Sequence, residues 1–131
     1  MQYIIVAIGG VAGSIARFAV GKYIAERKAL SFPLSTFLIN IIGAFLLGFA
    51  NGMDINSKLS LLFADGFLGA FTTFSTFMYE GFFLFQEDEK MPAFRYIFTT
   101  LFLGIIGFII GLEIGKFIHN LWKDEFYAFR G

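Results

Sequence analysis

Four long apolar stretches, separated by three short polar breaks, divide the 131-residue chain. A helix needs about 20 predominantly apolar residues to cross the hydrocarbon core of a bilayer. The four predicted spans cover residues 2–24, 33–53, 57–85 and 92–119. Because the polar breaks at 25–32, 54–56 and 86–91 are short, neighbouring helices must be antiparallel and packed together. The pattern predicts an all-α membrane bundle in which residues 1–131 form a single transmembrane domain.

Composition favours lipid as the surroundings of this bundle. Hydrophobic residues make up 57% of the chain and charged residues 15%, whereas soluble domains have about 45–50% and about 25%. A soluble protein of this size has too little interior to hide so much apolar surface. The formal net charge is zero, so the chain has no net positive charge that would attract nucleic acid. We expect a multi-pass protein of the cell (inner) membrane, in contact with the lipid bilayer and without a nucleic-acid partner.

Motifs for catalysis are missing from the sequence. The chain has no cysteine and one histidine, His119, which excludes disulfides, thiolate metal sites and cysteine nucleophiles. Neither a G-x-x-x-x-G-K-[ST] phosphate loop nor an H-E-x-x-H metal motif occurs. We predict that the protein is not an enzyme and has no organic cofactor.

Lysine and arginine are almost evenly divided between the two sides of the predicted bundle. Four spans place both termini on one side, with these basic residues: Lys58, Lys116, Lys123 and Arg130. On the opposite side lie Lys22, Arg27, Lys28, Lys90 and Arg95. Orientation normally follows the bias of these residues, and four against five gives almost none. We expect the chain to insert both ways and two copies to form an antiparallel, dual-topology homodimer, a symmetry that inverted-repeat transporters have within one chain.

Small residues recur at the spacing of helix contacts. The small-xxx-small sets are Gly9 and Gly13, Gly48 and Gly52, and Gly107, Gly111 and Gly115. Such sets allow helix backbones to approach closely in lipid. We favour this role over the general tolerance of membrane helices for glycine.

The third span is unusually rich in glycine and threonine. Glycine weakens a helix, and threonine hydroxyls compete for its carbonyls, so a break is expected near Gly69–Thr73. Broken backbone is tolerated in a membrane only where protein buries it or a wet cavity adjoins it, and freed carbonyls can bind a cation. A continuous helix with its hydroxyls bonded to their own turn is the open alternative.

Phe71, Phe74 and Phe77 recur every three residues, which predicts one shared helical face. Spacing alone favours packing against lipid or core. The sharper interpretation uses the positive edge of the phenyl ring, which could contact an anion in a narrow pore. The hydroxyls of Ser75 and Thr76 could then donate hydrogen bonds to that anion.

Polar residues inside the other spans each leave two interpretations open. Asn40, near mid-membrane, offers donors for an anion or an interhelical hydrogen bond. Arg17 is a functional candidate by its position, but it could also snorkel to the interface or pair with Asp65 or Glu80. Glu80 and Glu113 are expected near the ends of their spans, where they reach water.

Three stretches resemble the Fluc/CrcB fluoride channels of bacteria and archaea. They are GGVAGSIARF at 9–18, STFLINIIG at 35–43 and GFLGAFTTFSTF at 66–77, which are similar to the family patterns GGxxGxxxR, GTLxVNxxG and GxxGGxTTFSTF. The third motif is the most specific. Ser35 and Ala70 stand where the family has glycine, and both are small.

The resemblance implies an antiparallel homodimer with two pores that passively exports fluoride with high selectivity. Phe74 and Phe77 match the family's pore phenylalanines, and Asn40 matches its pore asparagine. Ser75 and Thr76 match the polar residues beside the rings.

The resemblance also implies a structural sodium ion at the dimer centre. Gly69 and Thr72 match the positions whose backbone carbonyls hold it, and Arg17 matches the first-helix arginine, which we place at the pore mouth. Two other functions compete. A small proton-coupled exporter would need a carboxylate in the first span, where no acid precedes Glu26. A structural subunit would use its polar residues only to join helices.

Overall fold

The computed structural model describes residues 1–27, 33–88 and 90–128, and these residues are almost entirely helical. In chain order the elements are α1 (Gln2–Arg27), α2 (Leu34–Gly52), α3 (Ser57–Ser60), the π-helix η1 (Leu61–Leu68), α4 (Gly69–Phe71), α5 (Phe74–Gln86) and α6 (Lys90–Ala128). Lys28 and Arg130, which entered the charge comparison, lie outside the described residues.

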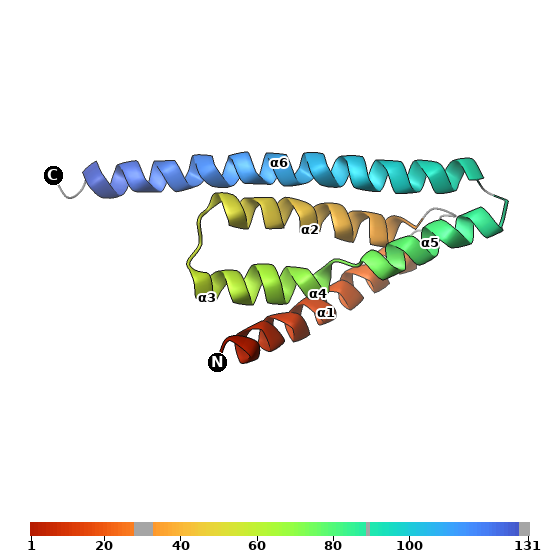
Figure 1. Ribbon diagram of the computed structural model, residues 1–131, viewed down its shortest axis with the longest axis horizontal. Coiled ribbons are helices and arrows are strands. Elements are labelled where there is room, and N and C mark those ends of the chain that lie inside the picture. The colour runs from red at the N-terminus through yellow and green to blue at the C-terminus, as the bar shows by residue number, and fades with distance from the viewer. Residues whose placement is uncertain (28–32, 89, 129–131) are drawn as a thin grey trace.

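Four helical stretches within the described residues are long and apolar enough to cross a membrane. They are Gln2–Glu26, Leu34–Gly52, Ser57–Gln86 and Lys90–Asp124. The predicted set of four membrane-length helices is therefore confirmed, and the chain is a multi-pass membrane protein. The third stretch runs from α3 through η1 and α4 to α5 and is bent where α4 meets α5 (Figure 1).

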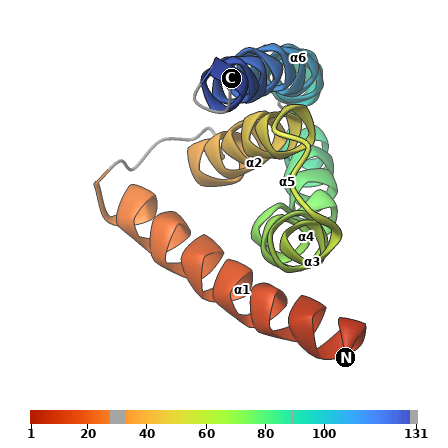
Figure 2. The same cartoon turned by 90° about the vertical axis from the view of Figure 1, so that its left-hand side faces the viewer.

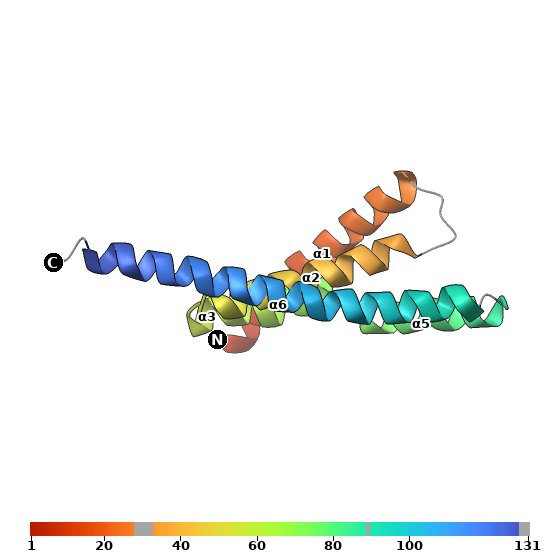
Figure 3. The same cartoon turned by 90° about the horizontal axis from the view of Figure 1, so that it is seen from above.

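The helices form two pairs that meet around the bend. α2 lies parallel along α6, with the contact register rising together from Phe45 against Gly111 to Phe49 against Gly115, and α1 packs obliquely on η1 and α4 (Figures 1 and 2). Viewed from above, α1 diverges from the bundle, and the C-terminal part of α6 extends beyond the other helices (Figure 3). The N-terminal end of α1 and the C-terminal end of α6 lie towards the same end of the bundle, as an even number of spans requires (Figure 1).

Glycine allows the close contacts within both helix pairs. A methyl group on Gly48 would overlap the carbonyl oxygen of Phe108 in α6, and one on Gly111 would overlap the carbonyl of Phe45 in α2. On the other pair, a methyl group on Gly9 would overlap the carbonyl of Leu62 in η1. Gly13, Gly52 and Gly115 are equally confined by backbone atoms. The small-residue sets therefore pack helices, as predicted.

The predicted break in the third span is confirmed and lies at two threonines. Thr72 (φ −75°, ψ 160°) and Thr73 (φ −146°, ψ 120°) are extended, whereas Gly69 is helical (φ −59°, ψ −34°). The prediction that Phe71, Phe74 and Phe77 share one helical face is wrong, because the break rotates α5 relative to α4. Phe71 is 6% exposed and stacks on Phe67 with ring centroids 5.7 Å apart.

α6 is longer than the predicted fourth span. The hydrophobic pattern placed the end of the span at residue 119, but the helix runs for 39 residues to Ala128. At 1.5 Å per residue this is roughly 58 Å, against about 30 Å for a hydrocarbon core. His119 Nδ1 lies 2.9 Å from the carbonyl oxygen of Met53, which fastens α6 to the turn after α2. The helix therefore extends beyond the thickness of the core.

Candidate functional site at the helix break

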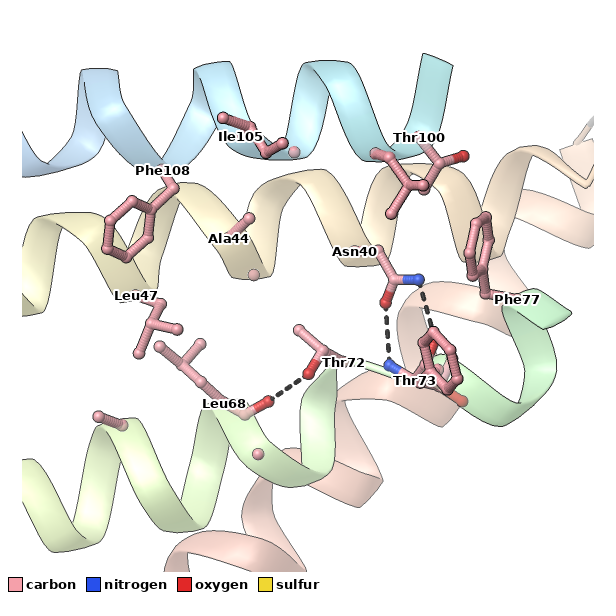
Figure 4. Close-up of a pocket in the computed structure, with 16 residues that line it drawn as sticks. Asn40, Ala44, Leu47, Leu68, Thr72, Thr73, Phe77, Thr100, Ile105 and Phe108 are labelled. Atoms are coloured by element: carbon pink, nitrogen blue, oxygen red, sulfur yellow. Dashed lines mark hydrogen bonds between the residues drawn. The ribbon is translucent and has the colours of Figure 1, made fainter. Parts of the chain in front are cut away.

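The break exposes peptide groups that would be hydrogen-bonded within a continuous helix, and buried peptide groups require partners. The Asn40 side chain of α2 is the partner of two of these peptide groups. The Thr73 N–H donates to Asn40 Oδ1 at 2.9 Å, and Asn40 Nδ2 donates to the Thr73 carbonyl at 2.9 Å (Figure 4). The interhelical hydrogen bond considered for Asn40 is thus present. An amide nitrogen carries two hydrogens, so one donor is still available to a ligand.

Hydroxyl groups support the ends of both helices at the break. Thr72 Oγ1 donates to the Leu68 carbonyl at 2.9 Å, and the Thr72 N–H donates to the same oxygen at 3.0 Å. Thr73 Oγ1 accepts from the Thr76 N–H at 3.3 Å and caps α5. The hydroxyls therefore bond the backbone on both sides of the break, one within the last turn of α4 and one as the cap of α5.

Arg17 of α1 lies against the break rather than at a distant interface. Its Nη1 donates to the Thr72 carbonyl at 3.3 Å, and the side chain is half-buried. Neither of the ion pairs found among the described residues involves Arg17, so the considered pairing with Asp65 or Glu80 is not observed. The guanidinium places a positive charge beside the carbonyl end of α4.

An open groove of about 500 Å³ adjoins the break between α2, the third span and α6. Its polar end is formed by Asn40, Thr72, Thr73 and Thr100, next to the ring of Phe77 (Figure 4). Phe74 also lines the groove. The remaining walls are apolar. A mostly apolar groove with a few convergent polar groups is typical of a site for a small ligand.

The two phenylalanines at the groove differ sharply in exposure. Phe77 is 3% exposed and meets the ring of Tyr96 at 5.3 Å between centroids, with the planes inclined at 55°. Phe74 is 73% exposed, and its centroid lies 6.2 Å from that of Phe77. Ser75 and Thr76 are exposed and do not line the groove. The structure therefore brings Asn40, Phe74 and Phe77 together and leaves the two hydroxyl residues outside the groove.

A carboxylate cluster that sequence reasoning missed joins three helices beside Phe77. Thr36 Oγ1 and the Tyr96 hydroxyl donate to the two carboxylate oxygens of Glu80, each at 2.9 Å. Thr36 is 4% exposed and Tyr96 is fully buried. Glu80 is part-exposed, in keeping with the expectation that it reaches water, and these donors also hold its carboxylate. Its partners are 44 and 16 residues away along the chain, so no local spacing points to them.

Backbone carbonyls are the ligands that this site offers to a cation. Among the described residues, no group of three or more His, Cys, Asp or Glu side chains could hold a metal ion. At the break, however, Thr73 directs its N–H to Asn40 instead of the Gly69 carbonyl four residues earlier. That carbonyl is consequently released from helical bonding, and Gly69 itself lines the groove.

Comparison with known proteins places the chain among membrane channels. Residues 4–112 match the family profile described as "CrcB-like protein, Camphor Resistance (CrcB)". Fluoride-specific ion channel FluC 2 of Clostridium acetobutylicum is 50% identical over 116 residues, which cover 88% of this chain and 99% of the relative. Fluoride-specific ion channel FluC 1 of Carboxydothermus hydrogenoformans is 41% identical over 117 residues, 89% and 95% of the two chains.

Proposed function

The chain belongs to the CrcB family of fluoride channels, and on that premise we propose that it is a fluoride-selective, passive ion channel that exports cytoplasmic fluoride. Membership of an ion-channel family also confirms the prediction that the chain is not an enzyme. The proposal further includes two pores per antiparallel homodimer and a sodium ion at the dimer centre.

The observation that carries the proposal is the meeting of Asn40 with Phe74 and Phe77 at one groove. One hydrogen of the Asn40 amide binds the Thr73 carbonyl, and the other is available to an anion. The edges of phenyl rings carry the positive part of the quadrupole. Together these groups can replace the water around a small halide without a full opposite charge, so the ion is held weakly enough to move on.

The Arg17 guanidinium adds a positive potential near the groove. It lies on the carbonyl side of the break through its bond to Thr72. The hydroxyls of Ser75 and Thr76, being exposed in the single chain, belong to the proposed path only if a second copy covers them. Each of these roles therefore depends on what faces the exposed side of the third span.

A second copy of the chain is the proposed cover. Gly69, whose carbonyl has lost its helical donor, and the hydroxyl residues Ser75 and Thr76 are exposed near the middle of a membrane span, where such groups require cover. The groove itself is open, and Gly69 and Phe74 line it. An oppositely inserted copy would close the groove against its own equivalent surface, because a two-fold axis brings the same patch of both subunits together.

Sodium fits the chemistry of the break. The Gly69 carbonyl has lost its helical donor, since the Thr73 N–H binds Asn40. The Thr72 carbonyl accepts one bond from Arg17, and a carbonyl oxygen has a second lone pair. When bound, sodium would supply a fixed positive charge that joins these oxygens from both copies.

Export requires no energy source within the protein. An inside-negative potential drives any anion outward by about 2.3 kcal/mol per charge per 100 mV. Hydrofluoric acid enters a cell uncharged and dissociates in the more alkaline interior, so a selective leak of fluoride is sufficient to lower its concentration.

Reconstitution tests the proposed function. Purified protein is placed in liposomes loaded with fluoride and chloride, and ion electrodes follow the release of both while a potassium ionophore balances charge. We expect rapid fluoride release with chloride retained. Fluoride release no faster than from protein-free liposomes, or equal release of chloride, would contradict the proposal and favour a structural subunit.

A further inference from the structure

We propose that Asn40 is a positioning residue for the cation site as well as a donor at the groove. By accepting the Thr73 N–H, it keeps that group away from the Gly69 carbonyl and leaves the carbonyl free for sodium. This inference rests on the sodium ion included in the proposed function. It adds that one side chain controls both the cation site and the anion path.

The hydrogen bonds at the break support this assignment. In a continuous helix, the N–H of residue 73 would donate to the carbonyl of residue 69, and that of residue 76 to the carbonyl of residue 72. Here the Thr73 N–H donates to Asn40 Oδ1, and the Thr76 N–H donates to Thr73 Oγ1. The two carbonyls proposed for sodium are therefore among those that the break leaves without their helical donors.

Of these two hydrogen bonds, the one that Asn40 accepts is the stronger. The bonds of Asn40 to Thr73 are reciprocal, both 2.9 Å long, and join different helices, whereas the Thr76 bond is local and 3.3 Å long. One turn along α2 from Asn40, a methyl group on Gly43 would overlap Thr72 Cγ2. Gly43 thus permits the close approach of α2 that brings the Asn40 amide within reach of the break.

The two atoms of the amide head allow the two roles to be separated. Asn40→Leu removes both the acceptor and the donors, so the Thr73 N–H is free to return to the Gly69 carbonyl. Asn40→Asp, whether charged or protonated, keeps an oxygen that accepts from Thr73 and loses the amide donor. Asn51→Leu is the matched control, because Asn51 Nδ2 donates only within α2, to the Leu47 carbonyl at 2.8 Å.

The test measures how sodium changes the thermal stability of the purified protein in detergent. Melting temperatures are compared in sodium chloride and in N-methylglucamine chloride of equal ionic strength, since a ligand that binds only the folded state raises the melting temperature. We expect the sodium-dependent rise in wild type and Asn51→Leu, its loss in Asn40→Leu, and a retained or larger rise in Asn40→Asp. Fluoride release by liposomes should be lost in both Asn40 variants.

Each outcome bears on the inference. An undiminished sodium effect in Asn40→Leu would overturn it, as would loss of the effect in Asn40→Asp. If Asn40→Leu does not fold, Asn40→Asp decides alone: a sodium effect without fluoride release supports the inference, and loss of both contradicts it. A wild type that releases fluoride but does not respond to sodium would overturn the inference and leave the channel function intact. Wild type that responds to sodium but releases no fluoride would count against the channel function alone.

Discussion

At the scale of single residues, the proposed chemistry of the site rests on uncharged groups with oriented dipoles. The Asn40 amide is tied at both atoms to Thr73, so its remaining N–H has a fixed direction at the groove. Phe77 is held by burial and by its contact with Tyr96. Such fixed donors need little reorganisation when an anion arrives, which is the general advantage of a preorganised site.

Phe77→Ile tests the ring-edge contribution. Isoleucine fills similar space without a quadrupole, and aromatic electrostatic contacts are worth about 0.5–1.5 kcal/mol, so fluoride release should fall by up to about tenfold. Phe74→Ile should act in the same direction. Phe98→Ile is the control, because Phe98 is exposed and lies outside the groove. Equal release by Phe77→Ile and the control, with the assembly intact, would exclude a role for the rings.

Tyr96→Phe tests the Glu80 cluster as a tie between α5 and α6. The change removes the hydroxyl that donates to Glu80 at 2.9 Å, and a hydrogen bond to a charged group contributes about 1.5–3 kcal/mol. Unfolding in mixed detergent micelles should show a loss of stability of that order. Tyr3→Phe, at an exposed position, should unfold like wild type. A Tyr96→Phe protein as stable as wild type would show that the cluster does not support the fold.

At the scale of elements, the helix pairs depend on glycine contacts and the site depends on the interrupted third span. α2 can lie this close to α6 only because Gly48 and Gly111 have no side chain, so the two backbones are in direct contact there. The same closeness at Gly43 brings α2 to the break. Packing and function are therefore linked through the position of α2.

Gly111→Ala tests this packing. The added methyl group would overlap the Phe45 carbonyl, and overpacking of a tight contact costs about 1–3 kcal/mol. Gly21→Ala is the matched control, since a methyl group there meets nothing within 4 Å. We expect the first variant to unfold more easily and the second to be at least as stable as wild type. Similar stability of the two variants would refute a packing role for Gly111.

Sequence reasoning was most successful where the signal is local. Apolar length identified the four spans, and the glycine and threonine content of the third span predicted its break. The sequence placed the break within 69–73; its extended residues are Thr72 and Thr73, and the partner of Thr73 is Asn40, 33 residues away, which no local pattern shows. Phe71 was misplaced for the same reason, because helical periodicity cannot continue across extended residues.

Other features depend on contacts that no spacing in the sequence encodes. The donors to Glu80 come from α2 and α6, and a search for local motifs finds neither. The end of α6 was predicted too early, since hydrophobicity marks where a span leaves the core but not where its helix ends.

At the scale of the whole molecule, the single chain leaves its candidate site open. The groove is open, Gly69 with its released carbonyl is exposed, as are Ser75 and Thr76, and unsatisfied polar groups in mid-membrane require cover. The nearly even distribution of lysine and arginine gives the chain little preference for one orientation. An oppositely inserted copy would cover the site, and the lack of an orientation preference would allow such a copy to form.

Two-sided labelling tests this central claim most directly. The chain contains no cysteine, so Tyr3→Cys and Lys123→Cys each create a single reactive position near one terminus. With a membrane-impermeant thiol reagent applied first outside and then inside sealed vesicles, the account predicts that each variant is labelled in part from both faces. Complete labelling from one face alone would contradict it.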